Sequence, residues 1–333
     1  MSHGQFYKAD ELVELIHHNF GGFHPGARAV HANGRIHAGT FTATVEAKSV
    51  SRAAHFQGTP IPVTSRFSGG SGDPGASAGG TIAMASRFYL PDGTVTDLIA
   101  INLPAFPARI PDDIIGLLSV AQPDPTTGKP DLAKVQAFLA DHPAAGRVVQ
   151  LLQVRPAPVS FAQVSYRPLH AFRFVNAAGE GCWARYHWEP EAGSAGQSAE
   201  EMSRQPHDFL FTELESRLQQ GAVAFRLDLQ LAQEGDPVDD PSAFWPDDRK
   251  RVTVGRLALT RPITQEEIGD PVLMHDPTLV TDGIEVCLDD QIMSARRGVY
   301  LSSVAQRTGG WQKQSPVLAE VARDRGPASA GIA

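Results

Sequence analysis

The 333-residue sequence predicts an α+β fold, in which an antiparallel β-barrel carries inserted and appended helices. Many short segments alternate apolar and polar residues with a period of two, which is typical of antiparallel strands. Helical patterns precede, interrupt and follow these segments, and this arrangement indicates strands that close into a barrel. No internal repeat is visible.

The first predicted element is a short amphipathic helix over residues 10–20. Asp10 can cap its start, and Gly21 and Gly22 can end it, because glycine adopts the left-handed conformation that terminates helices. Its apolar residues share one helical face and are Leu12, Val13, Leu15 and Ile16.

A period of two then predicts four strands, followed by two helices. The helices span 111–120 and 130–141, and each opens with a proline and acidic residues that suit a first helical turn. The four strands are expected at 40–47, 61–67, 81–90 and 96–102.

A second group of strands follows these helices. Strands at 170–176 and 182–188 flank the turn residues 178–180, as in a hairpin. The clearest strand spans 222–231, and its alternation predicts one buried face and one wet face. The remaining predictions are surface loops at 189–206 and 233–248, a strand at 252–260, a helix near 288–306 and a mobile tail from about 323.

Composition and charge exclude several classes of protein. A hydrophobic content of 42% over 333 residues can support one large core. A net charge of -8 argues against a nucleic-acid partner, because phosphate binding needs a concentrated positive surface. No run approaches roughly 18 apolar residues, and the N-terminal residues lack the features of a signal peptide, so we expect no membrane association and a cytoplasmic location.

The two cysteines, Cys182 and Cys287, lie in unrelated contexts without a CxxC partner. Neither a disulfide framework nor a thiolate metal site is therefore indicated. We expect both to be buried structural thiols.

Three segments carry candidate functional residues, and the first is RAVHANG at 28–34. Its His31 precedes a predicted strand. The chain holds 12 histidines, and a lone one in such a place is more often a hydrogen-bonded structural residue than a catalytic group. Taken alone, this segment favours a structural role.

The second segment combines TSRFS at 64–68 with the strand that ends at Asn102. Arg66 and Ser68 are two residues apart and therefore share one face of a strand. An amide at a strand end, just before Leu103 and Pro104, usually serves a turn. This segment alone also favours a structural role.

The third segment is RRGVYLSSVAQR at 296–307. In a helix, Arg296 and Tyr300 lie at positions i and i+4 on one face, and Arg307 returns to that face. A guanidinium beside a phenol favours the phenolate and lowers a pKa that starts near about 10. Such a phenolate is a hard, anionic iron ligand, although basic residues usually just coat a helix exterior.

Together these segments resemble the catalase family, over about residues 20–307. Agreement in one segment arises easily by chance, whereas agreement in five collinear segments does not. The similar segments are RAVHANG, TSRFS with the Asn102 strand, YRPLHAFRFVNAAGEGCWARYHW at 166–188, FWPDD with VTVGRLALTR at 244–261, and GIEVCLDDQIMSARRGVY at 283–300.

The resemblance implies a barrel of the catalase type with haem, expected to be iron protoporphyrin IX of the b type, buried between barrel and helices. Tyr300 would be the fifth ligand of the haem iron. Arg296 would hold the phenolate, with His170 and Asp290 behind it. We expect a single haem domain over 1–322 and a mobile tail at 323–333.

The resemblance also assigns the rest of the cofactor site. Arg28, Arg66 and Arg307 match positions that bind the haem propionates, which suits the pairing of guanidinium with carboxylate. Val30 lies beside the distal histidine, where the related allene oxide synthases have a threonine.

On the opposite haem face the resemblance places His31, Asn102 and Ser68. A neutral imidazole can move a proton between the two oxygens of a bound hydroperoxide at neutral pH. Asn102 would hydrogen-bond the outer oxygen, and Ser68 would fix the imidazole tautomer.

The chain departs from large catalases in ways that resemble the minimal catalase-related peroxidases. It shows little of their N-terminal arm, wrapping loop and C-terminal helical domain. Leu301–Val304 replaces a Pro-Asp-Thr-His run of that family, and Ile82–Met84 replaces an Arg-Gly-Phe run. A more open haem predicts a peroxidase that reduces hydrogen peroxide or organic hydroperoxides with small organic electron donors, with weak catalase activity. We expect a homodimer and assign no nicotinamide nucleotide site.

The sequence leaves two alternative functions open. A fatty-acid hydroperoxide isomerase of the allene oxide synthase type shares the tyrosine ligation, but Val30 favours peroxide reduction. A non-catalytic haem-binding protein would leave the joint presence of His31, Asn102, Ser68 and Tyr300 unexplained.

Overall fold

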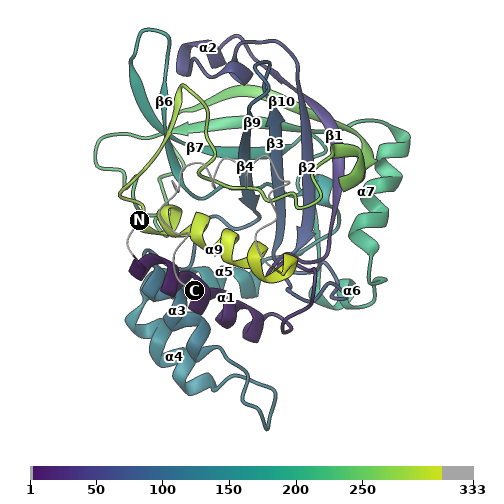
Figure 1. Cartoon of the computed structure of the whole chain (residues 1–333), viewed down its shortest axis with the longest axis vertical. Coiled ribbons are helices and arrows are strands. Elements are labelled where there is room, and N and C mark those ends of the chain that lie inside the picture. Colours follow the sequence, from purple (N-terminus) through teal and green to yellow (C-terminus); the bar gives the residue numbers. More distant parts are fainter. Residues whose placement is uncertain (1–2, 310–333) are drawn as a thin grey trace, which may run out of the picture.

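The computed structural model describes residues 3–309, and a curled antiparallel sheet forms its centre (Figure 1). Nine of the described strands are hydrogen-bonded in the order β11-β6-β7-β9-β10-β1-β2-β3-β4, and β5 and β8 form a separate pair. The strands are β1 Gly34–Ala43, β2 Ile61–Gly69, β3 Ile82–Tyr89, β4 Val95–Ile101, β5 Ala157–Pro158, β6 Ala171–Val175, β7 Gly181–Pro190, β8 Gly196–Gln197, β9 Val223–Leu231, β10 Arg251–Ile263 and β11 Ile284–Val286.

Two isolated bridges connect the β4 edge of the sheet to β7 and close the curl into a barrel. Ile101 at the end of β4 pairs with Arg167, and the adjacent Tyr166 pairs with Trp188 of β7. Both pairs are antiparallel. The backbone groups of the β4 edge are thereby partly satisfied, which is how a barrel avoids an open edge strand.

Helices cover one end and one flank of this barrel (Figure 1). The C-terminal α9 crosses below the strands beside the N-terminal α1, and α3, α4 and α5 lie beyond them. Helix α7 lies on the flank against β10. The helices are α1 His3–Asn19, α2 Ala47–Val50, α3 Pro111–Val120, α4 Leu132–Asp141, α5 Pro143–Val154, α6 Ala199–Ser203, α7 Phe209–Gln220, α8 Gln265–Ile268 and α9 Gln291–Thr308.

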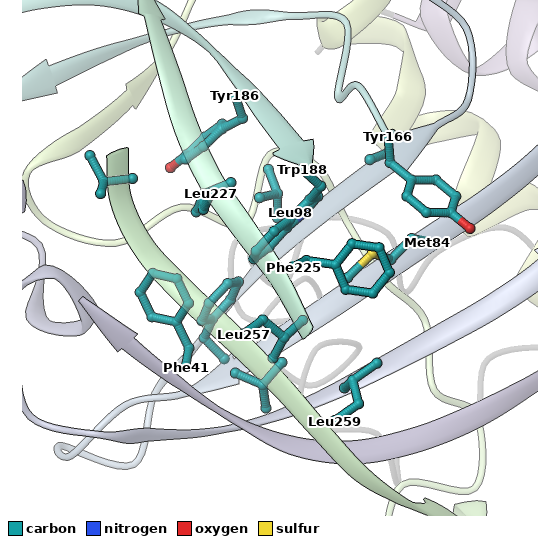
Figure 2. Packing of buried hydrophobic residues seen from close by; sticks show 14 of the residues in the cluster. Phe41, Met84, Leu98, Tyr166, Tyr186, Trp188, Phe225, Leu227, Leu257 and Leu259 are labelled. Atoms are coloured by element: carbon teal, nitrogen blue, oxygen red, sulfur yellow. The ribbon is translucent and has the colours of Figure 1, made fainter. Parts of the chain in front are cut away.

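The main hydrophobic core fills the interior of the barrel (Figure 2). Large side chains from β1, β7 and β9, among them Phe41, Trp188 and Phe225, point toward one another there and are fully buried. The rings of Phe41 and Trp188 meet edge to face with centroids 6.3 Å apart. Side chains therefore fill the interior of the barrel.

The predicted helices agree with the structure more closely in their interiors than at their ends. Helix α3 has the predicted bounds, and α4 starts after Asp131, whose carboxylate accepts from the amides of Ala133 and Lys134. The expectation that Asp10 caps α1 is wrong, because α1 begins at His3 and the Asp10 carboxylate instead accepts a hydrogen bond from the Ser302 hydroxyl of α9 at 2.5 Å.

Helices α5 and α7 were not predicted. Helix α7 lies between the loop predicted at 189–206 and the strand predicted at 222–231, in a segment for which no element was predicted. Its buried residues have helical spacing. These residues are Leu210, Phe211, Leu214 and Leu218. Their spacing is the signal that would have identified the helix.

The predicted strands are all present, with two corrections. Strand β1 spans Gly34–Ala43 rather than 40–47, because its pairing with β2 and β10 starts at the glycine-rich end, and α2 follows where the strand was expected to continue. The wet face expected for β9 is wrong, since only Arg226 is exposed there while Asp228 and Gln230 are buried.

The loop at 233–248 explains the buried outer face of β9. It contains no helix or strand, as predicted, but it packs against the sheet rather than standing in solvent. Gln230 donates to the carbonyl of Pro246 at 2.9 Å, and Trp245 is buried. Asp228 accepts from Thr253 of the neighbouring strand at 2.7 Å.

Three further predictions concern the thiols, the membrane and the tail. Cys287 is buried as expected, whereas Cys182 is only partly buried, and both thiols are free. Within residues 3–309, no helix combines the length and the hydropathy of a membrane span. The tail predicted at 323–333 lies outside the described residues.

Candidate active site

The segment 28–33 leads into β1 and holds His31 in an unusual backbone conformation. The φ angle of His31 is +58°, in the left-handed region that costs energy for most residues and is concentrated at functional sites. Two backbone hydrogen bonds tie this segment to the end of β2, from Ala32 to Ser71 and from Gly69 to Asn33. The neighbouring chain therefore holds His31 in place.

His31 is partly buried, and its Nδ1 hydrogen-bonds the Gly69 carbonyl oxygen at 2.9 Å. A carbonyl only accepts, so Nδ1 carries the proton and Nε2 keeps a free lone pair. Burial, and secondly the positive charge of Arg66, lower the pKa of His31 to about 4. His31 is therefore a neutral imidazole at neutral pH, with Nε2 able to accept a proton.

The structure corrects the role expected for Ser68. Its hydroxyl is buried on β2, but the atom that fixes the His31 tautomer is the carbonyl oxygen of the next residue, Gly69. Sequence reasoning missed Gly69, because a backbone carbonyl leaves no mark in residue type.

Asn102 follows β4, and its side chain connects two neighbouring strand ends. Its Oδ1 accepts from the Ile82 amide at 2.9 Å, and its Nδ2 donates to the Gly80 carbonyl at 3.3 Å. The Arg155 guanidinium donates to the carbonyls of both Asn102 and Gly80. These contacts match the turn role that the residue alone suggests and leave one N–H of the amide for another partner.

Arg28, Arg66 and Arg307 converge from three distant parts of the chain. Arg66 is nearly fully buried, and its guanidinium lies over Gly34, where an added Cβ would come within 2.4 Å of Cζ. Burial, and secondly Arg307, lower the pKa of Arg66 to about 10. Burial, followed by Arg66 and Arg307, lowers the pKa of Arg28 well below its ordinary value. The three cations therefore lie within electrostatic reach of one another.

These three guanidiniums donate to backbone carbonyls, and none forms an ion pair with a carboxylate of the described residues. Arg28 donates to Leu273, Arg66 to Ala32 and Arg307 to Val272. The Nε of Arg307 is buried without a partner in the described part of the chain. Arg66 is buried, Arg28 and Arg307 are partly buried, and Asp270 acts on the latter two without forming an ion pair. A cluster of cations without a direct carboxylate partner is suited to bind an anion.

On the other side of the site, α9 presents Arg296 and Tyr300 one turn apart, as predicted. The Arg296 guanidinium donates to the Tyr300 hydroxyl oxygen at 2.6 Å. Tyr300 is partly buried and packs against an apolar cluster that includes Val272 and Leu301. The phenol is therefore oriented both by a cation and by packing.

His170 and Asp290 form a buried pair behind α9. His170 Nδ1 donates to the Asp290 carboxylate at 2.6 Å, and Asp290 also caps α9 by accepting from the Met293 amide. Burial, opposed by this carboxylate, lowers the pKa of His170. No direct hydrogen bond joins this pair to Arg296 in the described residues, but Arg296 acts electrostatically on both His170 and His31.

The structure brings the two sides of the site together through α9. The Ala29 amide donates to the Ser303 hydroxyl at 3.2 Å, so the segment with His31 is fastened to the helix with Tyr300. Val30 lies between Ala29 and His31 and is partly buried. Among the described residues, no cluster of three or more His, Cys, Asp or Glu side chains could hold a metal ion.

The chain is similar to members of one protein family. The family model described as Catalase matches residues 11–325. A catalase-related peroxidase of Mycolicibacterium paratuberculosis is 39% identical over 303 residues, covering 90% of this chain and 95% of the relative. A catalase-related peroxidase of Synechococcus elongatus is 35% identical over 303 residues, covering 90% and 89%.

A solved structure described as that of a bacterial catalase supports the fold. It matches with a TM-score of 0.76 at 21% sequence identity, covering 88% of this chain and 59% of the solved chain. This chain thus spans about three fifths of that catalase. The family model and the curated relatives show that the chain belongs to the catalase family and groups with its catalase-related peroxidases.

Proposed function

We propose that this chain is a haem peroxidase that reduces hydrogen peroxide or a small organic hydroperoxide with electrons from a small organic donor. Family membership supports peroxidase or catalase chemistry in general. The observation that carries the proposal is the hydrogen bond from Arg296 to the Tyr300 hydroxyl. A guanidinium in this position stabilises a phenolate, and tyrosinate is the proximal ligand of haem iron in catalases.

The arginine cluster fits the two carboxylates that haem carries. Arg28, Arg66 and Arg307 are collected without a carboxylate partner in the described residues, and Arg307 Nε is unsatisfied. Guanidinium forks suit carboxylate oxygens in a water-poor site. We infer that these three residues bind the propionates of iron protoporphyrin IX and that Val30 lies against the cofactor.

When bound, haem supplies the iron centre and the electron transfer that peroxide reduction requires. Tyr300 would hold the iron through its phenolate oxygen, to which Arg296 donates a hydrogen bond. The His170–Asp290 pair would fix the start of α9 and so position the helix that carries the ligand.

On the distal side, His31 would move a proton. Its Nε2 is free because Nδ1 donates to Gly69, and its lowered pKa keeps that nitrogen unprotonated at neutral pH. Nε2 would accept the proton of one hydroperoxide oxygen and return it to the other. The remaining N–H of Asn102 would hydrogen-bond the outer oxygen.

Absorption spectroscopy and activity assays test this proposal. The protein reconstituted with haem should show the charge-transfer bands of phenolate-ligated ferric haem, and Tyr300→Phe should lose them. Donor oxidation should exceed oxygen release when a chromogenic phenol is in excess. Haem-loaded His31→Ala should keep its haem but lose about 100-fold or more in turnover, whereas the exposed His18→Ala should keep both.

Three outcomes would overturn parts of the proposal. Failure to take up haem would remove the assignment as a whole. Oxygen release that dominates under excess donor would replace peroxidase with catalase activity. A lipid hydroperoxide that is isomerised without consumption of donor would favour the hydroperoxide isomerase.

We further propose a haem domain that ends near residue 322 and a homodimer in solution. Both assignments follow from the resemblance of the sequence to the family. Light scattering of the purified protein would determine the number of subunits.

A further inference from the structure

The loop at 270–276 gathers arginines through a row of backbone carbonyls. Three consecutive residues each accept one guanidinium hydrogen bond, and the middle residue, Leu273, has a φ angle of +37°. That positive φ is unfavourable for a leucine and has to be stabilised by the surrounding contacts. The three pairs are Val272 with Arg307 at 2.6 Å, Leu273 with Arg28 at 2.5 Å and Met274 with Arg87 at 2.5 Å.

The charges at this loop are not balanced. Arg87 is neutralised by Asp97, which receives two of its hydrogen bonds, and by Asp270. Arg28 and Arg307 form no ion pair in residues 3–309, although Asp270 acts on both electrostatically. The loop therefore positions one cation with direct carboxylate partners and two cations without one, and Arg66 lies close to both of the latter.

His275 is the next residue of the same loop. Its side chain is 8% exposed, and its Nε2 is buried without a hydrogen-bond partner in residues 3–309. A buried polar atom without a partner is unfavourable, so such an atom is suited to donate to or accept from a bound ligand. Burial, and after it the charges of Arg87, Arg28, Arg66 and Arg307, hold the pKa of His275 well below its ordinary value. His275 is therefore neutral and has a single N–H to donate.

Other buried histidines of the described chain also have unpartnered nitrogens, but their surroundings differ. His55 lies among Phe41, Phe56 and Phe88 in the barrel core, and burial alone lowers its pKa. His37 packs against Phe67 on the inner face of the barrel. Aromatic rings surround His55, and the opposite charges of Glu215 and Arg35 act on His37. The charges that act on His275 are all cationic, and three of them belong to the arginine cluster.

We propose that His275 is a fourth haem-binding side chain, whose imidazole N–H donates to the propionate carboxylates that Arg28, Arg66 and Arg307 neutralise. This inference rests on the haem site proposed above and adds a residue to it. The loop 270–276 then contributes to the anion site in two ways. Three of its carbonyls orient arginines, and His275 supplies one neutral hydrogen-bond donor. A neutral donor completes the hydrogen bonds of a carboxylate without adding a further buried charge.

The test compares two forms of the cofactor that differ only at the carboxylates. Apoprotein is titrated with haemin and with haemin dimethyl ester, and binding is followed by absorption. His275→Phe should weaken haemin binding about tenfold, the size of one hydrogen bond to a charged acceptor, and leave ester binding within about twofold. His275→Gln keeps a donor near the position of Nε2 and should recover most of the haemin affinity.

His55→Phe is the matched control, since it replaces a buried histidine with a phenylalanine far from the cation cluster. It should bind both cofactors like the unaltered protein, and circular dichroism should show that all variants are folded. Equal losses with haemin and ester in His275→Phe, or no loss with haemin, would overturn the inference alone. If the unaltered protein bound neither compound, the haem site itself would be refuted, and the role of His275 with it.

Discussion

The carboxylate of Asp290 joins His170 to the start of α9. One oxygen accepts from His170 Nδ1 at 2.6 Å, and the other accepts from the Met293 amide at 2.8 Å. Both side chains are almost completely buried. The helix that presents Arg296 and Tyr300 is therefore positioned from its first turn by a residue 120 positions away in the sequence.

Asp290→Ala should destabilise the fold more than the loss of an ordinary helix cap. A cap is worth about 1 kcal/mol, and the unpartnered His170 adds about 1–3 kcal/mol to the loss. Denaturant titration measures the difference. Asp131→Ala, which removes the exposed cap of α4, is the matched control, and an Asp290→Ala loss no larger than that of the control would contradict the expectation.

The reaction of the haem-loaded protein with peroxide should be independent of pH until strongly acidic conditions. His31 is the proton acceptor, and its pKa is lowered from 6.5 to about 4 by burial and by Arg66. The active neutral form of His31 is thus fully populated at pH 7, and its population falls as pH decreases through about 4. Stopped-flow mixing with hydrogen peroxide checks this, and a rate that halved near pH 6.5 would show that His31 titrates normally.

Buried histidines should make the barrel sensitive to acid. Burial, as the first cause in each case, lowers the pKa from 6.5 to about 4 in His37 and to about 3 in His55 and His187. Above pH 6.5 these groups are neutral in both states. As pH falls toward 4 only the unfolded chain binds the protons, so each group costs on the order of 1 kcal/mol per pH unit.

His55→Phe tests this dependence, because phenylalanine suits the surrounding rings of Phe41, Phe56 and Phe88. The free energy of unfolding, measured by denaturant titration at several pH values, should fall less steeply below pH 6.5 in the variant. Identical slopes would mean that His55 does not remain neutral in the folded protein.

Gly34→Ala should displace Arg66 and weaken haem binding. The added Cβ would lie 2.4 Å from the Arg66 guanidinium carbon, which is closer than any stable contact. Arg66 would have to leave the cation cluster, at an affinity loss of about tenfold for a charged hydrogen bond. Gly221→Ala, where nothing lies within 4 Å of the new Cβ, is the control, and titration with haemin compares the two.

Asn102→Ala should lower stability by about 1–3 kcal/mol, since it leaves the Ile82 amide without its acceptor. Asn102→Asp keeps an acceptor for that amide but removes the N–H groups. If the free N–H of Asn102 serves the bound oxidant, Asn102→Asp should fold normally and still lose turnover. Unchanged turnover in Asn102→Asp would mean that the role of Asn102 is structural and consists of connecting the two strand ends.

Particular elements show where sequence reasoning succeeded and where it failed. Helix α3 has its predicted bounds because Pro111 and the acidic residues after it are local signals. Strand β1 was misplaced by several residues because its start, at Gly34, depends on pairing with β2 and β10 rather than on its own pattern. The buried state of Asp228 likewise depends on Thr253 of the adjacent strand and on Arg226.

The sequence by itself determined the type and order of eight of the strands and four of the helices, the spacing that puts Arg296 and Tyr300 on one helical face, and the resemblance to the family. Those features are encoded over a few residues, as in the i,i+4 contact of that pair. Only the tertiary structure decided that Gly69 orients His31, that Leu273 orients Arg28 and that the Nε2 of His275 is buried without a partner in residues 3–309. Such contacts join residues up to 245 positions apart, and they form only when closure of the barrel and packing of α9 bring distant backbone groups together.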